Sequence, residues 1–457
     1  MKKSIISRRE FVKNTSIGMA GTAVAGKLLF ATGQTALSAN GKPAVLGGSP
    51  SHSGAWPDWP LWDPAKDEAQ ILQVLRSGIW SRDKLVAEFE KKWAEMLGVK
   101  RCLATTNGTH ALISGLKMLG IGAGDEVITT PYTFIATIDA IILCNAMPVF
   151  VDVDQETFQL DPQKIEAKIT PRTRAIIPVH ILGLPVDMDR IMTIAKKYDL
   201  IVLEDACQAH LAEFDSKKTG AIGHAGCFSF QTSKNLPLGE GGALVSDDED
   251  LMDRAFSFHN FGRPYGRMVG DVSGEYVMVG TKCRATEYQA AIGLAQMERL
   301  ERQTEERNQN AVYLRAQIED IPGILPYRLY DKVNRATYHL FPFRFKKEYF
   351  NNLSRKKFIQ ALRAEGIPCS SGYTPLNTMP YLKDALTSRV FKAVYPAEEL
   401  DYAGYLERNR CPENDQLCEE AVWLPQNVLL GTKTELDDIA AALEKIHNSA
   451  AEINRKV

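Results

Sequence analysis

The chain has 457 residues, of which 45% are hydrophobic and 24% are charged, and its formal net charge is -2. A chain of this length and apolar content buries a large core and exceeds the usual size of one domain. The nearly balanced charge leaves no basic field for nucleic acid, so we expect no nucleic-acid partner and small-molecule chemistry instead.

The first 39 residues have the order of an export signal. Paired Arg8 and Arg9 precede Phe11 and Lys13, and a weakly apolar stretch and small residues up to Ala39 follow. This order predicts a twin-arginine signal peptide over residues 1–39 and a periplasmic or otherwise exported protein; the alternative is a disordered basic tail. No later apolar run reaches the roughly 18 residues that span a bilayer, so we expect no transmembrane segment after the signal.

Short β-rich runs alternate with longer helical patterns along the rest of the chain. The runs are, in order, CLATT, EVITT, PVFVDV, AIIPVHI, LIVLED, CFSFQ and ALVS. Their alternation with helices predicts an α/β layer with a mostly parallel sheet of about seven strands, covered by helices on both faces. We expect this large domain, with an N-terminal arm, over residues 40–300.

The pattern changes after Gly280. A long helical periodicity with charged residues on its outer face comes first, as expected for a link between domains. The remainder, with YHLFPFRF and further helical spacings, predicts a smaller α+β domain over residues 301–457.

Two other cofactor classes fit the sequence poorly. The glycines of LGIGAGDEV end a helix and precede a strand, whereas a dinucleotide fingerprint follows a strand and opens a helix. The histidines show no paired ligand spacing, so we expect no metal. Cys411 and Cys418 are close enough for a local disulfide, although folding before export argues against dependence on one.

A carboxylate and a lysine at strand ends are the most informative feature. Asp205 ends the run IVLED, Ser229 lies near the end of the run CFSF, and Lys234 follows in the segment QTSKN. Pyridoxal phosphate needs a charge partner for its pyridinium nitrogen and an amine for a Schiff base. These residues therefore predict a site for that cofactor.

Three further positions support this site without proving it alone. Asn107, Gly108 and Thr109 separate a strand from a helix, where free backbone N–H groups and the helix dipole hold phosphate. Phe134 opens a helix and could stack on a flat ring, although a core aromatic is the commoner reading. His180 follows the strand AIIPV, and functional groups gather at the carboxyl ends of parallel strands.

The landmarks NGTHAL, PYTFIAT, PVHILGLPVDMD, EDACQAH, SFQTSKN with GEGG, FHNFGR, RATEYQAAIGLAQ, YHLFPFR and GYTPL occur in one order across residues 45 to 450. In this the chain resembles the DegT/StrS aminotransferases, fold-type I pyridoxal-phosphate enzymes that act on keto sugars and keto cyclitols. The resemblance implies that Lys234 forms the internal aldimine and that Asp205 binds the pyridinium nitrogen. It also implies that Phe134 stacks on the ring and that Gln208 lies near the ring or its 3-hydroxyl.

The resemblance further implies the phosphate contacts. Gly108, Thr109 and His110 would donate backbone N–H groups, and Ser229 would add its hydroxyl. In this family an asparagine from a second copy completes the phosphate site, and Asn260 in FHNFG is the best match. A homodimer follows from this assignment.

The implied activity is transfer of an amino group from Glu or Gln to a keto sugar or keto cyclitol. Relatives that dehydrate sugars have histidine in place of the lysine, so Lys234 favours transamination. The alternatives are a sugar dehydratase or isomerase using the same cofactor, and a non-catalytic regulatory homologue that keeps it.

The sequence departs from many nucleotide-sugar relatives in the segment GTKCRAT. Lys282 and Cys283 stand where those relatives have an asparagine and an aromatic residue. The segments SFQTSK and FHNFGR are more similar to those of relatives that act on inososes or make aromatic amines. We expect His180, Lys282 and Arg284 to contact the substrate; for Lys282 and Arg284 a surface or interface ion pair is an equally good reading.

Overall fold

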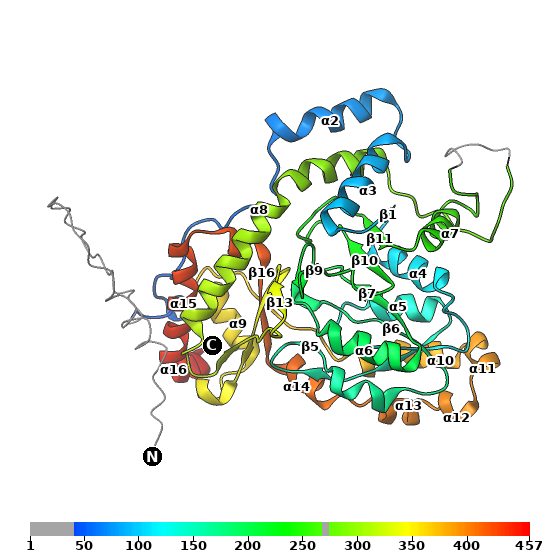
Figure 1. The fold of residues 1–457 in the computed structure, drawn as a ribbon. Helices are drawn as coiled ribbons and strands as arrows, with labels where there is room; N and C mark the ends of the chain where they lie inside the picture. Colours follow the sequence, from blue (N-terminus) through cyan, green and yellow to red (C-terminus); the bar gives the residue numbers. More distant parts are fainter. Residues whose placement is uncertain (1–40, 267–273) are drawn as a thin grey trace, which may run out of the picture. The chain divides into compact units, whose positions relative to one another are not determined.

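A seven-stranded sheet organises the larger part of the molecule (Figure 1). The computed structural model describes residues 41–266 and 274–457, which belong to one unit, Ser38–Val457. The expected signal at 1–39 lies outside the described residues, and in the part that is described no helix is long and apolar enough to cross a membrane.

The strand order is β1-β11-β10-β7-β6-β2-β3. The strands are β1 (Arg101–Thr105), β2 (Glu126–Thr129), β3 (Met147–Phe150), β6 (Thr173–Ile176), β7 (Ile201–Asp205), β10 (Ala225–Ser229) and β11 (Gly242–Ser246). Only β11 runs against the others, since it pairs antiparallel with both of its neighbours. The predicted mostly parallel α/β sheet is confirmed, and each of the predicted β-rich runs contains one of its strands.

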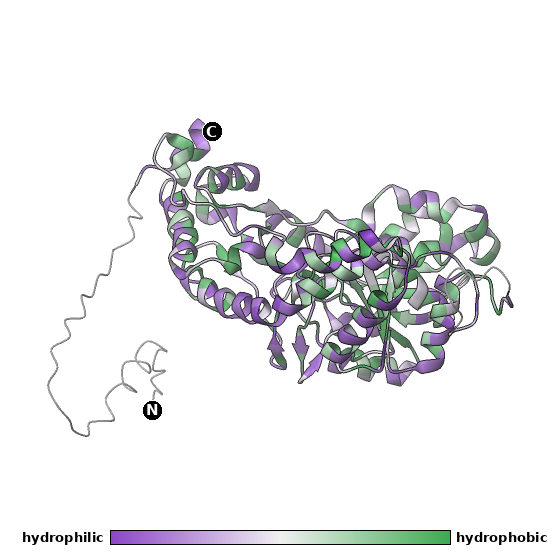
Figure 2. Ribbon diagram, turned by 90° about the horizontal axis from the view of Figure 1, so that it is seen from above, coloured by the Kyte–Doolittle hydropathy of each residue, from purple (hydrophilic) through white to green (hydrophobic). Residues whose placement is uncertain are grey.

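Helices cover both faces of this sheet because its strands are apolar on both sides. They are α3 (Lys84–Leu97), α4 (Gly108–Met118), α5 (Ala136–Leu143), α6 (Met188–Tyr198) and α7 (Glu249–His259), whereas α2 (Pro64–Ser77) packs on the long helix α8 (Glu287–Ile318). Phe89 and Trp93 of α3 pack on Phe228 and Phe230, whereas Ile191 of α6 belongs to a separate cluster. In Figure 2 the helices of the molecule carry both hydrophilic and hydrophobic residues, as expected of helices that face a core on one side.

The long helix α8 (Glu287–Ile318) carries the chain from the first sheet to a second one. The second sheet is antiparallel, with the order β12 (Ile324–Pro326), β14 (Leu340–Phe345), β16 (Ala421–Pro425) and β15 (Ser370–Ser371). Helices α9 (Arg355–Ala364), α15 (Lys433–Asn448) and α16 (Ala450–Lys456) pack around it. The expected domain boundary at residue 300 falls inside α8.

Between β15 and β16 the chain returns to the first sheet. This excursion contains α10 (Tyr381–Thr387), α11 (Arg389–Val394), α12 (Ala397–Leu400), α13 (Tyr402–Arg408) and α14 (Pro412–Glu420). The remaining short strands are β4 (Val153–Asp154), β5 (Gln159–Leu160), β8 (Glu213–Phe214), β9 (Lys217–Lys218) and β13 (Val333–Arg335), and the 3-10 helices are η1 (Ala44–Leu46), η2 (Pro162–Lys164), η3 (Glu166–Lys168), η4 (Ile181–Gly183), η5 (Lys347–Phe350), η6 (Leu376–Thr378) and η7 (Gln426–Leu430).

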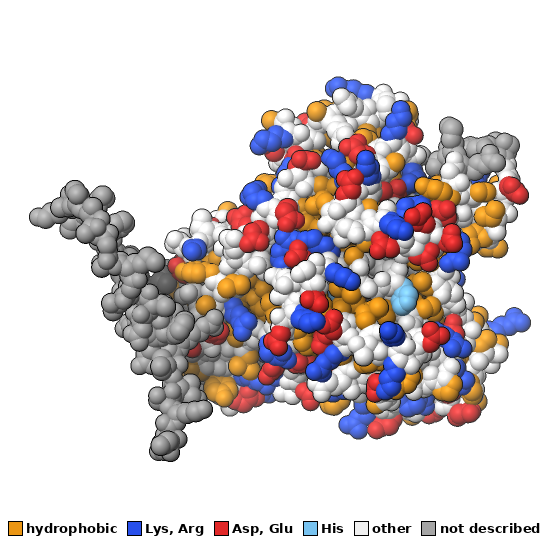
Figure 3. All heavy atoms as spheres, viewed as in Figure 1, with side chains coloured by type: hydrophobic (Ala, Val, Ile, Leu, Met, Phe, Trp, Pro, Cys, Tyr) orange, Lys and Arg blue, Asp and Glu red, His pale blue; other side chains and the backbone are white. Residues whose placement is uncertain are grey.

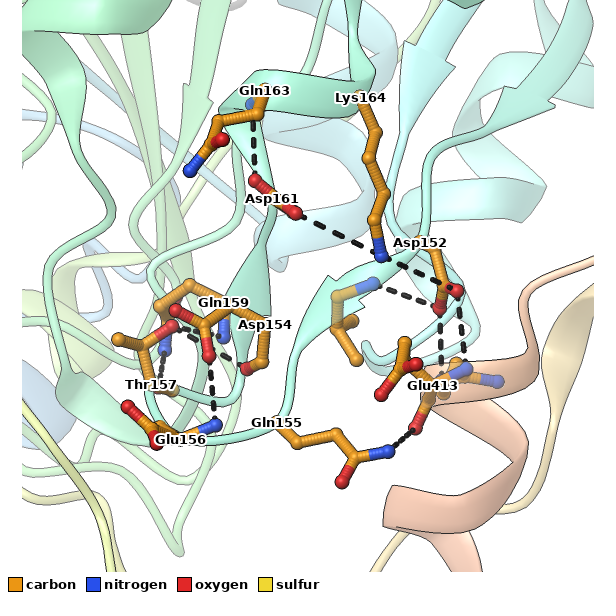
Figure 4. Close-up of polar contacts among 12 residues, drawn as sticks. Asp152, Asp154, Gln155, Glu156, Thr157, Gln159, Asp161, Gln163, Lys164 and Glu413 are labelled. Atoms are coloured by element: carbon orange, nitrogen blue, oxygen red, sulfur yellow. Dashed lines mark hydrogen bonds and ion pairs between the residues drawn. The ribbon is translucent and has the colours of Figure 1, made fainter.

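Buried Asp152 fastens this excursion to the first sheet (Figure 4). The residue before α14 is Cys411, whose side chain does not cap the helix. Asp152, which is distant in sequence, caps the helix instead: its carboxylate accepts hydrogen bonds from the backbone N–H of Glu413 at 3.1 Å and of Asn414 at 2.8 Å. Lys164 lies 3.6 Å from the same carboxylate, so the anion is partly balanced.

All eight cysteines are free thiols, including the buried pair Cys411 and Cys418. On the face drawn in Figure 3, positive and negative side chains are interspersed.

Candidate active site

A cavity of about 520 Å³ opens at the carboxyl ends of the parallel strands. Its lining residues come from the segments that follow β1, β2, β6, β7 and β10, with additions from the second sheet. They are Asn107, Gly108, Thr109, Leu112, Thr133, Phe134, Ala136, Thr137, Val179, Asp205, Cys207, Gln208, Ser229, Gln231, Ser233, Lys234, Glu240, His339 and Tyr373. Open α/β sheets bind ligands at this edge, and the position agrees with the sequence prediction.

One wall of the cavity is the first turn of α4. The Asn107 side chain caps the helix by accepting the His110 N–H at 2.9 Å, which leaves the amides of Gly108 and Thr109 for another acceptor. Gly108 lies against the end of β10, since a Cβ on it would be 2.8 Å from Cβ of Ser229 and 2.9 Å from Sγ of Cys207. Only glycine allows this approach, which brings two free amides and a serine side chain together.

Asp205 occupies the centre of the cavity wall at the end of β7. Its side chain is almost wholly buried, with 5% of its surface exposed. One carboxylate oxygen accepts the Cys207 N–H at 3.1 Å, and the other accepts the Thr137 hydroxyl at 2.8 Å. Two donors fix the orientation of this anion, so it is held ready for a cationic partner in the cavity.

Lys234 lies in the loop that joins β10 to β11. The loop is held from the second part of the chain, because Gln426 donates its side-chain N–H to the carbonyl of Ser233 at 3.0 Å. Asn235 donates in turn to the carbonyl of Thr337 at 2.8 Å. Burial lowers the pKa of Lys234, and the nearby Cys207 and Asp205 oppose that shift. A lysine with a lowered pKa has a larger neutral fraction, which is the nucleophilic form.

Phe134 and Gln208 line the same cavity. Phe134 has 58% of its surface exposed and therefore presents a free aromatic face. Gln208 is fixed at both ends, since it accepts the Leu182 N–H at 2.8 Å and donates to the Tyr373 hydroxyl at 2.9 Å.

The prediction for His180 has no support in this geometry. Its ring is fully buried outside the cavity wall, with Nε2 at 2.9 Å from the Glu204 carboxylate and Nδ1 accepting the Val186 N–H. The reason is strand alternation: Val179 and Asp205 face the cavity, so their neighbours His180 and Glu204 point to the opposite face and meet there.

His110, Asn260, Lys282 and Arg284 also lie outside the cavity wall. The His110 amide is taken by Asn107, as described above. Asn260 is buried, pairs with Lys282 in an isolated β-bridge and accepts a hydrogen bond from Arg284 at 3.0 Å. Asn260, Lys282 and Arg284 therefore lie next to one another, at a site separate from the cavity.

Thr137, Cys207, Tyr373 and His339 are among the cavity residues that the sequence reasoning missed. Thr137 lies one helical turn beyond Phe134, and Cys207 lies two residues beyond Asp205, so their positions within recognised motifs were the available signal. Tyr373 and His339 come from the second part of the chain, where the landmarks GYTPL and YHLFPFR contain them. Burial, followed by the charge of Lys234, lowers the pKa of His339 well below its usual value, so this histidine is neutral.

The model of the DegT/DnrJ/EryC1/StrS aminotransferase family matches residues 63–444. The chain belongs to this family. Its relative SpsC, a spore coat polysaccharide biosynthesis protein of Bacillus subtilis (strain 168), is 38% identical over 323 residues, which are 69% of this chain and 82% of that protein. The L-glutamine:scyllo-inosose aminotransferase of Streptomyces griseus is 33% identical over 426 residues, covering 90% and 99% of the two chains. The crystal structure of 3-amino-5-hydroxybenzoic acid (AHBA) synthase matches with a TM-score of 0.76 and 30% identity, over 88% of this chain and 100% of that one.

Aminotransferases of this family depend on pyridoxal phosphate, and the cavity fits that group. The free amides of Gly108 and Thr109 suit a phosphate, and Asp205 suits a protonated ring nitrogen. Lys234 provides the amine, and the exposed ring of Phe134 a stacking surface. The volume of about 520 Å³ lies within the range of small-molecule sites.

Proposed function

We propose that this protein moves the amino group of L-glutamine to a keto cyclitol, with pyridoxal phosphate as cofactor. The observation that carries the proposal is the pairing, in one cavity, of a lysine of lowered pKa with a buried carboxylate fixed by two donors. The Streptomyces griseus relative is named for L-glutamine and scyllo-inosose, which supports the choice of donor and acceptor class.

The bound cofactor supplies an electron sink for the carbon that loses or gains the amine. Asp205 keeps the ring nitrogen protonated, because its anion lies in a buried site where a cation is its best partner. Gly108, Thr109 and Ser229 would hold the phosphate. Lys234 would hold the cofactor through its amine and would move a proton at the substrate carbon as general base and acid.

The segment around Asn260 supports a homodimer. The side-chain N–H₂ of Asn260, Nε of Arg263 and Nε2 of His259 are buried without hydrogen-bond partners among the described residues. Beside them Arg284 adds a cation, and Val279 leaves 93% of its surface exposed. Unused polar groups, two donors on Asn260 and Arg263 and one acceptor on His259, next to an exposed apolar side chain suit a contact with a second copy, in which Asn260 would reach the partner's phosphate and Lys282 and Arg284 its substrate.

The paired arginines at the N-terminus support export of the folded protein by the twin-arginine route. Uptake of the cofactor before export is compatible with that route. Cell fractionation of the wild type and of the double variant Arg8→Lys, Arg9→Lys tests this proposal. Periplasmic location of the wild type but not of the variant supports export by this route, and the same distribution of the two proteins rejects it.

The enzymatic proposal is tested by the absorption of the purified protein with bound cofactor before and after excess L-glutamine. We expect the band of the lysine-bound cofactor to disappear in the wild type and to be absent from Lys234→Ala. Addition of scyllo-inosose should then restore the band. A band that ignores every amino donor would favour a dehydratase or a regulatory protein, and failure to take up the cofactor would reject all three.

A further inference from the structure

Tyr373 lines the active-site cavity with a hydroxyl proton that no group of the described residues accepts. The direction of its hydrogen bond follows from Gln208. The Leu182 N–H donates to Oε1 of Gln208 at 2.8 Å, so the N–H₂ end of the amide faces Tyr373. This end donates to the Tyr373 hydroxyl oxygen at 2.9 Å. Because the oxygen accepts from Gln208, its own proton is left to donate to a ligand.

The position and the charge state of the Tyr373 hydroxyl are both fixed. Its ring packs edge-on against Tyr132 and Trp423, with centroids 5.3 Å and 4.7 Å away. Burial raises the pKa of Tyr373 above the ordinary value of 10, so the phenol keeps its proton at every physiological pH. The cavity therefore contains a neutral hydrogen-bond donor that cannot easily turn away.

His339 brings a second neutral polar group to the same cavity. Only 6% of its surface is exposed, and it is one of the lining residues. Its Nδ1 is enclosed without a partner among the described residues, and Nε2 is the ring nitrogen that reaches the cavity surface. Burial lowers the pKa of His339 well below its usual value. In a neutral imidazole one nitrogen donates and the other accepts, so Nε2 is free to do one or the other.

His339 and Tyr373 both approach the cavity beside Gln208. Gly183 allows this approach for His339, because a Cβ on it would lie 2.8 Å from the backbone nitrogen of His339 and 2.9 Å from the carbonyl oxygen of Gln208. His339 directly precedes β14, and Tyr373 follows β15 by two residues. The groups that suit the cofactor all belong to the first sheet and its helices. His339 and Tyr373 therefore form a neutral wall that is supplied by the second sheet.

We propose that Tyr373 and His339 bind hydroxyl groups of the acceptor ring and so determine its specificity. The proposal rests on the proposed aminotransferase function and names acceptor-binding residues for it. A hydroxyl oxygen accepts the proton of Tyr373, and a hydroxyl both donates and accepts, so it suits either tautomer of His339. A site with such groups discriminates strongly against analogues without the hydroxyl, because its own polar atoms are then left unpaired. L-glutamine has no hydroxyl, so the two residues serve the acceptor half of the reaction.

The test is Tyr373→Phe in the holoenzyme, which removes the hydroxyl and keeps the ring that packs on Tyr132 and Trp423. We expect the half-saturating concentration of scyllo-inosose to rise roughly 3- to 10-fold, as for the loss of one neutral hydrogen bond. That of L-glutamine should change by less than about twofold. Tyr381→Phe is the matched control, because the Tyr381 hydroxyl is buried without a partner outside the cavity lining. An unchanged value for scyllo-inosose, or an equal rise for both substrates, would overturn the proposal.

The affinity for pyridoxal phosphate separates this role from a role in holding the cofactor. Tyr373→Phe also deprives the Gln208 amide of its acceptor, and Gln208 lines the cavity. We expect the variant to bind the cofactor within about twofold of the wild type and to keep the absorption band of the lysine-bound form. A weaker affinity for the cofactor with an unchanged response to scyllo-inosose would mean that the hydroxyl acts on the cofactor, which contradicts the proposal.

His339 is tested by two substitutions. His339→Phe keeps a ring without nitrogen atoms and should raise the half-saturating concentration of scyllo-inosose by a similar factor. In His339→Gln the side-chain amide reaches about as far as Nε2, so part of the affinity should return. If the two variants respond alike to scyllo-inosose, or if neither differs from the wild type, His339 does not bind the acceptor.

A binding measurement gives an answer that does not need turnover. The probe is scyllo-inositol, which has the ring hydroxyls and lacks the carbonyl group, titrated into the holoenzyme in a calorimeter. We expect it to bind the wild type and to bind Tyr373→Phe roughly 3- to 10-fold more weakly. Equal affinities, or no binding to the wild type, would overturn the assignment of hydroxyl groups. If the wild type accepts no amino donor, the proposed function fails, and this titration still decides whether Tyr373 binds a polyol.

Discussion

Replacement of Gly108 by alanine should weaken cofactor binding while leaving the fold intact. The added Cβ would lie 2.8 Å from Cβ of Ser229 and 2.9 Å from Sγ of Cys207. Ser229 ends a central strand and cannot retreat, so the start of α4 must move by about 0.6 Å to reach the 3.4 Å of an ordinary contact. That displacement carries the amides of Gly108 and Thr109 with it. Strain of about 1–3 kcal/mol corresponds to a roughly 5- to 150-fold higher dissociation constant for pyridoxal phosphate.

The assay is titration of the cofactor-free protein with pyridoxal phosphate, followed by absorption. Gly122→Ala is the matched control, because its Cβ would have only the carbonyl oxygen of Cys144 nearby, at 3.9 Å. Adding Cys207→Ala to Gly108→Ala removes one of the two close contacts and should recover part of the affinity. If Gly108→Ala binds the cofactor within about threefold of the wild type, the amides of this turn do not hold the phosphate.

Three other predictions follow from contacts and charges of the described residues. Burial lowers the pKa of Lys234 below the ordinary lysine value of 10.5. In a stopped-flow pH series, the rate at which Lys234 captures pyridoxal phosphate should therefore reach its maximum below pH 10.5. A rate that keeps rising up to pH 10.5 would contradict the lowered pKa. Burial holds the pKa of His210 at about 3, against 6.5 for the ordinary group, so its contribution to stability is complete above pH 6.5 and is lost as the pH falls towards 3; His210→Gln should make the free energy of unfolding less sensitive to acid by about 2 kcal/mol at pH 5, and an unchanged pH dependence would refute this. Asp152→Ala should lower the free energy of unfolding by about 2–3 kcal/mol in denaturant titration, because two backbone amides of α14 lose their acceptor. Asp161→Ala is the control: its carboxylate caps only a short surface turn, so the free energy of unfolding should fall by less than half as much.

The sheet was predictable because each of its strands is a short apolar run bounded by polar or turn residues. Runs such as EVITT and LIVLED become β2 and β7, and the carboxyl end of LIVLED places Asp205 in the cavity. Phe134, at the start of a helix, also lines it, and the family resemblance added Gln208. Local pattern therefore sufficed for the scaffold and for the residues attached directly to it.

The errors and omissions arise where local pattern does not determine side-chain direction or long-range contact. His180 stands at a strand end, but alternation turns it towards Glu204 and away from the cavity. Tyr373 meets Gln208 across 165 positions of sequence, and Asp152 caps α14 across about 260. Such contacts depend on how the second sheet docks on the first, which the periodicity of either segment does not encode.

Docking of the second sheet also determines the position of the reactive lysine. The loop that carries Lys234 is held by Gln426 on one side and, through Asn235, by the carbonyl of Thr337 on the other. His339, two residues beyond Thr337, reaches the cavity from the same segment, and Trp59 of the N-terminal arm holds the carbonyl of Thr232. Three segments that are distant in sequence therefore fix one loop. A shift of the second sheet, or of Trp59, therefore acts directly on the backbone that positions the amine of Lys234.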